Sequence, residues 1–173
     1  MNEQSSRNAW KGLAAGVVGG VVASWTMDRF QYWWLSFGGG DERELQQAPS
    51  EIANREEPAT VRTASAISEG VFGHSLTPRE KEIAGPIVHY AVGTTAGAVY
   101  GLAAEYEPKV TTLAGVPFGA AFWMVVDEGA LFLLGLAKGP AAYPISTHAY
   151  ALASHLVFGV TAEVVRSTAR RAL

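Results

Sequence analysis

The sequence predicts an all-α membrane protein with four transmembrane helices, arranged as two tandemly repeated hairpins with a helical extracytoplasmic loop between helices 1 and 2. Three observations lead to this prediction. Charged residues make up 17% of the 173 residues, against roughly 25% in an ordinary soluble domain. The acidic residues gather between Asp41 and Glu82, so the rest of the chain contains long stretches with almost no charge. The few ionisable residues inside those stretches recur at fixed offsets.

Four apolar stretches are long enough to cross a bilayer, whose hydrocarbon core of about 30 Å needs roughly 20 helical residues. They cover residues 10–37, 83–104, 110–136 and 144–165. The chain 1–173 is then a single membrane domain with one hydrophilic loop over residues 38–82. The alternative is a soluble protein with four fully buried helices. So short a chain has too little polar surface to cover them.

The first stretch is predicted to be an uncleaved anchor and not a secretory signal peptide. Its apolar part is longer than the roughly 7–15 residues of a signal-peptide core, and no clean cleavage site follows it. Lys and Arg close to span ends set the orientation of a membrane protein. Such residues flank the spans at both chain ends, namely Arg7, Lys11, Arg166, Arg170 and Arg171. We therefore expect both termini on the cytoplasmic side.

The hydrophilic loop is predicted to contain two surface helices, over residues 42–53 and 60–71. The glycine run 38–40 ends the first span, because the lysine and Ser/Thr of a phosphate-binding loop do not follow it. The segment Thr77-Pro78-Arg79-Glu80 predicts the start of the second span. It combines an N-cap threonine, an N1 proline and the glutamate of a capping box.

An internal repeat relates the two halves of the chain. A shift of 99 residues superposes the first span on the third and matches Gly16, Gly20 and Asp28 with Gly115, Gly119 and Asp127. A shift of 66 residues superposes the second span on the fourth and matches His89 and Gly93 with His155 and Gly159. Small apolar residues match often by chance, but here the rare Asp and His residues also coincide. Hairpins duplicated in tandem are related by a pseudo-twofold axis along the membrane normal.

Glycines recur every four residues in several spans, as in Gly12-Gly16-Gly20 and Gly93-Gly97-Gly101. Lipid gives apolar helices no hydrophobic reason to associate, so small residues that allow close backbone approach supply the packing. The stripes predict a tight helical bundle and indicate nothing about its function.

Ionisable side chains inside the predicted spans form the candidate site: Asp28, His89, Asp127, Glu128, His148 and His155. A charge in hydrocarbon costs several kcal/mol, so such groups face the bundle interior or a wet cavity. Three interpretations stay open. The groups neutralise one another and only hold the bundle, or they relay protons or small ions, or they bind a metal or haem. No HExxH or ExxH spacing supports a metal, so we predict no metal and no cofactor.

Several function classes are excluded or disfavoured. The chain has no cysteine, which excludes disulfides, thiolate metal sites and thiol catalysis. Its net charge of −3 provides no basic face for nucleic acid. Ser154 and His155 are adjacent, and neighbouring residues on a helix point apart, so they do not form a nucleophile–base pair. We predict no catalytic residue and no enzyme activity.

Five short segments carry a family resemblance: residues 64–74, 89–90, 127–129, 143–150 and 154–156. They resemble bacterial proteins of the YagU-like uncharacterised family, and the likeness extends from the first span to Arg166. The resemblance implies a bacterial inner-membrane protein with several spans, and it supplies no catalytic residue. The long first loop differs most from that family.

The functional prediction is a non-enzymatic inner-membrane protein whose Asp/His cluster is structural or handles protons or small ions. The alternative is an accessory subunit that packs on a larger membrane complex through its glycine stripes and acidic loop. The expected partners are the lipid bilayer and either a second copy of the chain or a membrane complex. An ion-handling bundle should contain a hydrated cavity that reaches Asp28 and Asp127.

Overall fold

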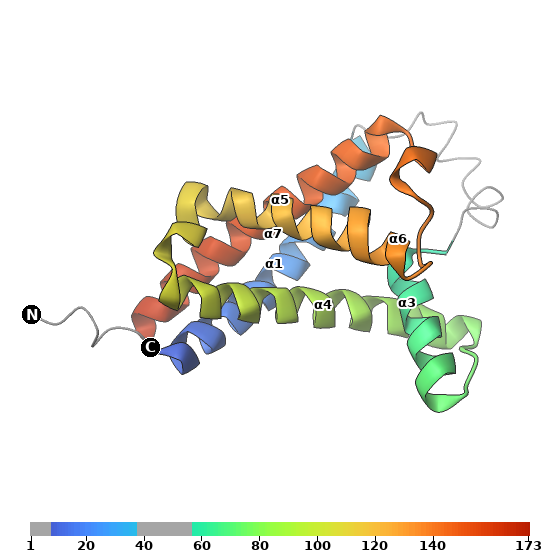
Figure 1. Ribbon diagram of the computed structural model, residues 1–173, viewed down its shortest axis with the longest axis horizontal. Helices are drawn as coiled ribbons and strands as arrows, with labels where there is room; N and C mark the ends of the chain where they lie inside the picture. Colours follow the sequence, from blue (N-terminus) through green and yellow to red (C-terminus); the bar gives the residue numbers. More distant parts are fainter. Residues whose placement is uncertain (1–7, 38–56) are drawn as a thin grey trace, which may run out of the picture.

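The computed structural model describes residues 8–37 and 57–173, and within these ranges the chain is helical with no strand. Long helical segments run back and forth along the molecule (Figure 1). They are α1 (Ala9–Phe37), α4 (Pro78–Tyr106), α5 (Val116–Trp123) with its continuation, and α7 (Ile145–Ala172). The short helix α3 (Ala59–Ile67) packs against α4. The all-helical part of the fold prediction is confirmed.

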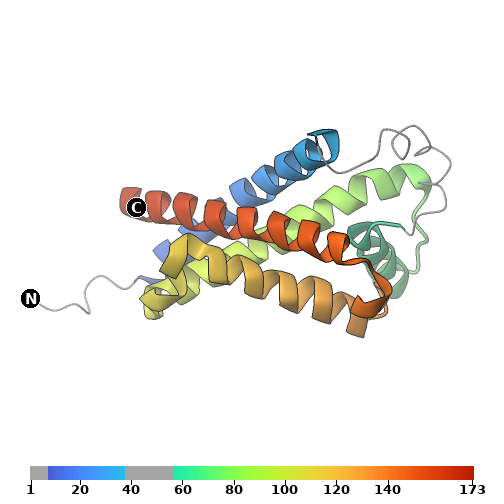
Figure 2. The ribbon, with the colours of Figure 1, turned by 90° about the horizontal axis from the view of Figure 1, so that it is seen from above.

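The helices converge at one end of the molecule, where α1 begins and α4 and α7 end. Asn8 N donates to Glu105 Oε2 at 3.0 Å, and Arg170 Nη2 donates to the same oxygen at 3.1 Å. We call this the terminal end, defined by Asn8, Glu105 and Arg170. The helices spread apart toward the opposite end, where α3 lies (Figures 1 and 2). We call that the cavity end.

Helices α1 and α4 touch through their backbones. A Cβ atom added to Gly97 would lie 2.5 Å from both the Gly16 carbonyl oxygen and the Gly20 Cα. One added to Gly20 would lie 2.6 Å from the Gly93 carbonyl oxygen. Real Cβ atoms essentially never come closer than 3.0 Å to such atoms. Only glycine therefore fits along this contact.

Helices α5 and α7 approach each other in the same way. A Cβ atom added to Gly159 would lie 2.7 Å from the Gly119 nitrogen, and one added to Gly119 would clash with the His155 carbonyl oxygen. Each of the two hairpins therefore has its own glycine contact, while α1 and α7 pack together between the hairpins.

The start of α4 is as the sequence predicts. Thr77 is the N-cap, its Oγ1 accepts from Glu80 N at 3.4 Å, and Thr77 N donates to the Glu80 carboxylate at 2.7 Å. The backbone N–H and the hydroxyl of Thr77, with the His74 imidazole beside them, lower the pKa of Glu80 from 4.5 to about 2. The capping box is therefore confirmed.

The predicted surface helix 60–71 corresponds to α3 followed by a π-helix, Ser68–Phe72. The other predicted surface helix, 42–53, and the glycine run 38–40 lie outside the described residues.

The third predicted span, 110–136, is helical over most of its length but is not one uninterrupted α-helix. The chain turns through the 3₁₀ segment Pro108–Gly115, where Leu113 and Ala114 adopt φ of 52°. After α5 come a π-helix, Met124–Ala130, and one short turn, α6 (Leu131–Leu133). The reason is tertiary, because α5 must fold back onto α7 directly after α4 ends. Gly115, at φ 83°, makes that turn against the Gly159 backbone.

One helical stretch in the described part of the chain, Pro108–Leu133, is long and apolar enough to cross a membrane by length and composition. The other predicted spans are long helices that contain many glycine, tryptophan, serine and ionisable residues, which lower their mean hydropathy. The arrangement of four spans is therefore not confirmed and stays a prediction.

Candidate functional site

Each helical hairpin contains one Asp–His pair. His89 Nε2 lies 3.1 Å from Asp28 Oδ1, which joins α4 to α1. His155 Nδ1 lies 3.7 Å from Asp127 Oδ2, which joins α7 to the π-helix after α5. The four residues that the two sequence shifts matched thus meet as two pairs, one in each hairpin.

Each imidazole also faces a backbone carbonyl, which determines where one of its hydrogens lies. His89 Nε2 is 3.3 Å from the Ser24 oxygen, and His155 Nδ1 is 2.9 Å from the Ala151 oxygen. A carbonyl oxygen only accepts, so each of these nitrogens carries a hydrogen. The other nitrogen of each ring has no hydrogen-bond partner among the described residues.

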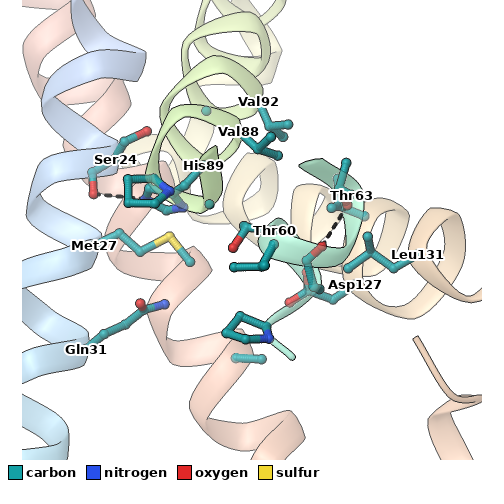
Figure 3. Close-up of a pocket in the computed structure, with 18 of the residues that line it drawn as sticks. Ser24, Met27, Gln31, Thr60, Thr63, Val88, His89, Val92, Asp127 and Leu131 are labelled. Carbon is teal, nitrogen blue, oxygen red and sulfur yellow. Dashed lines mark hydrogen bonds between the residues drawn. The ribbon is translucent and has the colours of Figure 1, made fainter. Parts of the chain in front are cut away.

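Both pairs line one cavity of about 950 Å³ at the cavity end of the bundle. In Figure 3, Ser24, Met27 and Gln31 of α1 lie on one side, and Asp127 and Leu131 lie on the other. His89 comes from α4, and Thr60 and Thr63 of α3 lie between these walls (Figure 3). Much of the lining is apolar and includes Met27, Val88, Val92, Phe122, Val126, Leu131 and Phe158.

Ser24 is fully buried in the cavity wall, one helical turn before Asp28. Its hydroxyl has no hydrogen-bond partner among the described residues. Buried hydroxyls are nearly always paired. This one is packed against α4, since a Cβ atom added to Gly93 would clash with the Ser24 Oγ.

Glu128 and His148 form a third pair outside the cavity lining. His148 Nδ1 lies 2.6 Å from Glu128 Oε1, and its Nε2 lies 3.0 Å from the Pro140 oxygen. Both ring nitrogens face acceptor oxygens, so His148 can donate to the Glu128 carboxylate and to the Pro140 carbonyl at the same time. The structure therefore divides the six candidate residues into four at the cavity and two beside it.

The π-helix explains how Asp127 and Glu128 both reach α7. Neighbouring residues on an α-helix diverge by about 100°, while π-helical turns are wider and occur frequently at functional sites. Asp127 faces His155, and Glu128 faces His148, seven residues earlier on α7. His148 and His155 are seven residues apart and share a face of α7. The π-helix that faces them was not predicted from the sequence.

A buried ionic cluster between the cavity and the terminal end was missed by the sequence analysis. Tyr100 OH donates to Glu163 Oε2 at 2.9 Å, and Arg166 donates from Nε and Nη2 to the two Glu163 oxygens, each at 2.8 Å. The three residues are at most 9% exposed. The spacing of Glu163 and Arg166, three residues apart at the end of an apolar helix, was the signal that could have revealed this cluster.

Groups of three or more His, Cys, Asp or Glu that could hold a metal ion do not occur among the described residues. The histidines of the cavity meet one carboxylate each. These residues give the metal interpretation no ligand set.

The fold and the site define an all-helical protein with paired ionisable side chains along a half-open cavity between the helices. Residues 62–164 match the family DUF1440, described as a protein of unknown function, and the chain belongs to that family. The matched region runs from α3 to α7 and contains five of the six candidate residues, all except Asp28. No curated protein and no solved structure matches the chain. The resemblance to the YagU-like family is thus not confirmed by a named relative.

Proposed function

We propose that this chain is a non-enzymatic, four-span inner-membrane protein whose two Asp–His pairs take up and release protons at a shared cavity. In this way it handles protons or small ions without a cofactor. One observation carries the proposal: the Asp–His pairs of both hairpins line the same cavity. Pairs that only hold helices together have no need to share a cavity, whereas a relay needs groups that a mobile ion can reach.

The distribution of side chains supports a location in the membrane. Large apolar side chains point outward: Ile87 and Val99 are each 62% exposed, and Leu133 is 81% exposed. Inside the bundle lie small and polar residues such as Ser24 and Ser154, both fully buried. Monomeric soluble proteins rarely expose large contiguous apolar patches. Helices in lipid satisfy their backbone polar groups internally and can present apolar side chains to the hydrocarbon.

Equivalent contacts support the tandem repeat. Gly20 packs on Gly93 in the first hairpin, and Gly119 packs on Gly159 in the second. The shifts of 99 and 66 residues that relate these glycines also relate the two Asp–His pairs. Each hairpin therefore has an equivalent glycine–glycine contact and an equivalent Asp–His pair. Parallel repeats of this kind, related by an axis along the membrane normal, are known in transporters.

The proton chemistry follows from the hydrogen bonds of the two imidazoles. In the neutral state one nitrogen carries a hydrogen that the Ser24 or Ala151 carbonyl accepts. A proton arriving from the cavity binds the opposite nitrogen, and the adjacent aspartate balances the new charge. Loss of that proton restores the neutral ring. Histidine suits this cycle because its ordinary pKa lies near neutrality.

Transfer of a proton across the bundle requires movement at the terminal end. Between the cavity and that end, the glycine contacts and the Tyr100–Glu163–Arg166 cluster hold the helices together. The proposed moving contact is between the hairpins, where a Cβ atom added to Gly19 would lie 2.8 Å from the Ala162 oxygen. Small residues at such a contact let two hairpins rock against each other.

The test is proton flux into proteoliposomes that contain a pH-sensitive dye, with potassium and valinomycin to cancel the membrane potential. We expect flux with the wild-type protein, and we expect Asp28→Asn and Asp127→Asn to lower it to the rate of protein-free liposomes. The control variant Glu107→Gln removes an exposed carboxylate after α4, at the opposite end from the cavity, and should retain full flux.

Wild-type liposomes that take up protons no faster than empty ones would refute the proposal. Stoichiometric co-purification with another membrane protein, with Asp127→Asn still assembled, would then favour the accessory-subunit alternative.

A further inference from the structure

We infer that the cavity binds a lipophilic organic cation, which competes with protons for the two Asp–His pairs. The inference rests on the proposed function and names the class of substrate that the same site would take. It comes from the size of the cavity, the composition of its walls and the balance of charge around it.

The size and the walls of the cavity indicate an organic molecule. A volume of about 950 Å³ is much larger than an inorganic ion needs and lies within the roughly 300–1,000 Å³ of small-molecule sites. Met27, Phe122 and Phe158 lie on these walls. Such side chains offer a hydrated ion no favourable contact, but they bury an apolar body and offer aromatic faces to a cation.

The charge balance selects a cation. The charged and titratable residues of the lining come from α1, α4, the π-helix and α7: Asp28, Lys81, Glu82, His89, Asp127, Tyr150 and His155. Beside the lining, Tyr90 lies close to Asp28 and Arg29. Lys81 Nζ already lies 2.7 Å from the Glu57 carboxylate. With both imidazoles neutral, three carboxylates face one engaged lysine, so the cavity attracts cations and repels organic anions.

Competition with protons follows from the same arrangement. A proton held at either Asp–His pair balances the charge of its aspartate, which leaves Glu82 and weakens the attraction for a cation. A bound cation therefore favours release of those protons, and its affinity rises as the pH rises.

The test compares tetraphenylphosphonium with tetraphenylborate, two ions of the same shape and opposite charge, by equilibrium dialysis against the detergent-solubilised protein. Protein-free micelles give the background. We expect saturable binding of the phosphonium ion at pH 8, about tenfold weaker binding at pH 6, and no saturable binding of the borate ion. Asp28→Asn and Asp127→Asn should each weaken binding of the phosphonium ion by about tenfold or more. Glu107→Gln should leave it unchanged.

The comparison of the two ions on the wild-type protein does not depend on any variant folding. Equal binding of both ions, or no saturable binding of the phosphonium ion, overturns the inference. If aspartate-dependent proton flux persists in that case, the proposed function stands and its substrate is an inorganic ion or the proton itself. Binding of the phosphonium ion without proton flux supports the site and refutes the proposed proton handling.

Discussion

Replacement of Gly97 by alanine tests whether backbone contact holds α1 against α4. The new Cβ atom would lie 2.5 Å from the Gly16 oxygen and 2.5 Å from the Gly20 Cα, while ordinary van der Waals contact begins at 3.4 Å. Because both neighbours are backbone atoms, neither can rotate away. The two helices must separate by about an ångström at this point.

The expected cost follows from that separation. A radial gap of 0.5–1 Å forfeits about a quarter to a half of the dispersion energy of facing atoms, and overpacking a well-packed contact costs about 1–3 kcal/mol. We expect Gly97→Ala to lower the free energy of unfolding by about 2–3 kcal/mol, near the upper limit because the clash is with backbone on both sides. Separation of α1 from α4 would also pull Asp28 away from His89.

The assay is unfolding in mixed micelles by titration with sodium dodecyl sulfate, followed by tryptophan fluorescence. Gly70→Ala is the matched control, since no atom lies within 4 Å of a Cβ at position 70. That control should change the unfolding free energy by no more than about 0.5 kcal/mol. If Gly97→Ala unfolds like the control, the helices are not in backbone contact and the packing argument is wrong.

Three further predictions concern single polar groups. Glu163→Gln leaves Arg166 buried without a charged partner. In the sodium dodecyl sulfate titration it should lower the free energy of unfolding by about 3–5 kcal/mol. A loss below about 1 kcal/mol would mean that the Glu163–Arg166 pair is solvated. The pKa of Glu80 is lowered from 4.5 to about 2, so its stabilising effect is complete above pH 4.5 and disappears as the pH falls toward 2. The difference in unfolding free energy between wild type and Glu80→Gln should therefore shrink between pH 6 and pH 3. A difference that does not change with pH would contradict the capping role of Glu80. Ser24→Ala should leave the free energy of unfolding unchanged or raise it, since a buried hydroxyl without a partner costs about 1–3 kcal/mol. Marked destabilisation in the same unfolding assay would show that the Ser24 hydroxyl is hydrogen-bonded.

Local patterns in the sequence predicted the parts of the fold that depend on neighbouring residues. The first span was expected over residues 10–37 and is helix Ala9–Phe37. The threonine and glutamate of the capping box are three residues apart, so their hydrogen bonds form as soon as the helix starts. The Asp–His pairs join the residues that the two sequence shifts matched, one pair in each hairpin.

Tertiary contacts determine the parts that the sequence did not predict. Leu113 and Ala114 adopt a left-handed backbone that their own side chains disfavour, so no local pattern could have predicted it. Only the contact between Gly115 and Gly159 explains that turn. Arg166 was placed just beyond a span that was expected to end at residue 165, but α7 continues to Ala172 and buries it beside Glu163. A charged residue at an expected boundary was thus assigned to solvent.

The two halves of the proposed repeat agree and differ in a way that bears on function. They agree where helices pack, since each hairpin has a glycine contact followed toward the cavity end by an Asp–His pair. They differ where the cavity forms. Helix α3, which packs against α4, supplies part of the lining on the side of the first hairpin, and the π-helix Met124–Ala130 carries Asp127 on the side of the second. A bundle held together only for its own stability would have no reason to concentrate its differences around one cavity. The ligand that we infer for that cavity would provide such a reason.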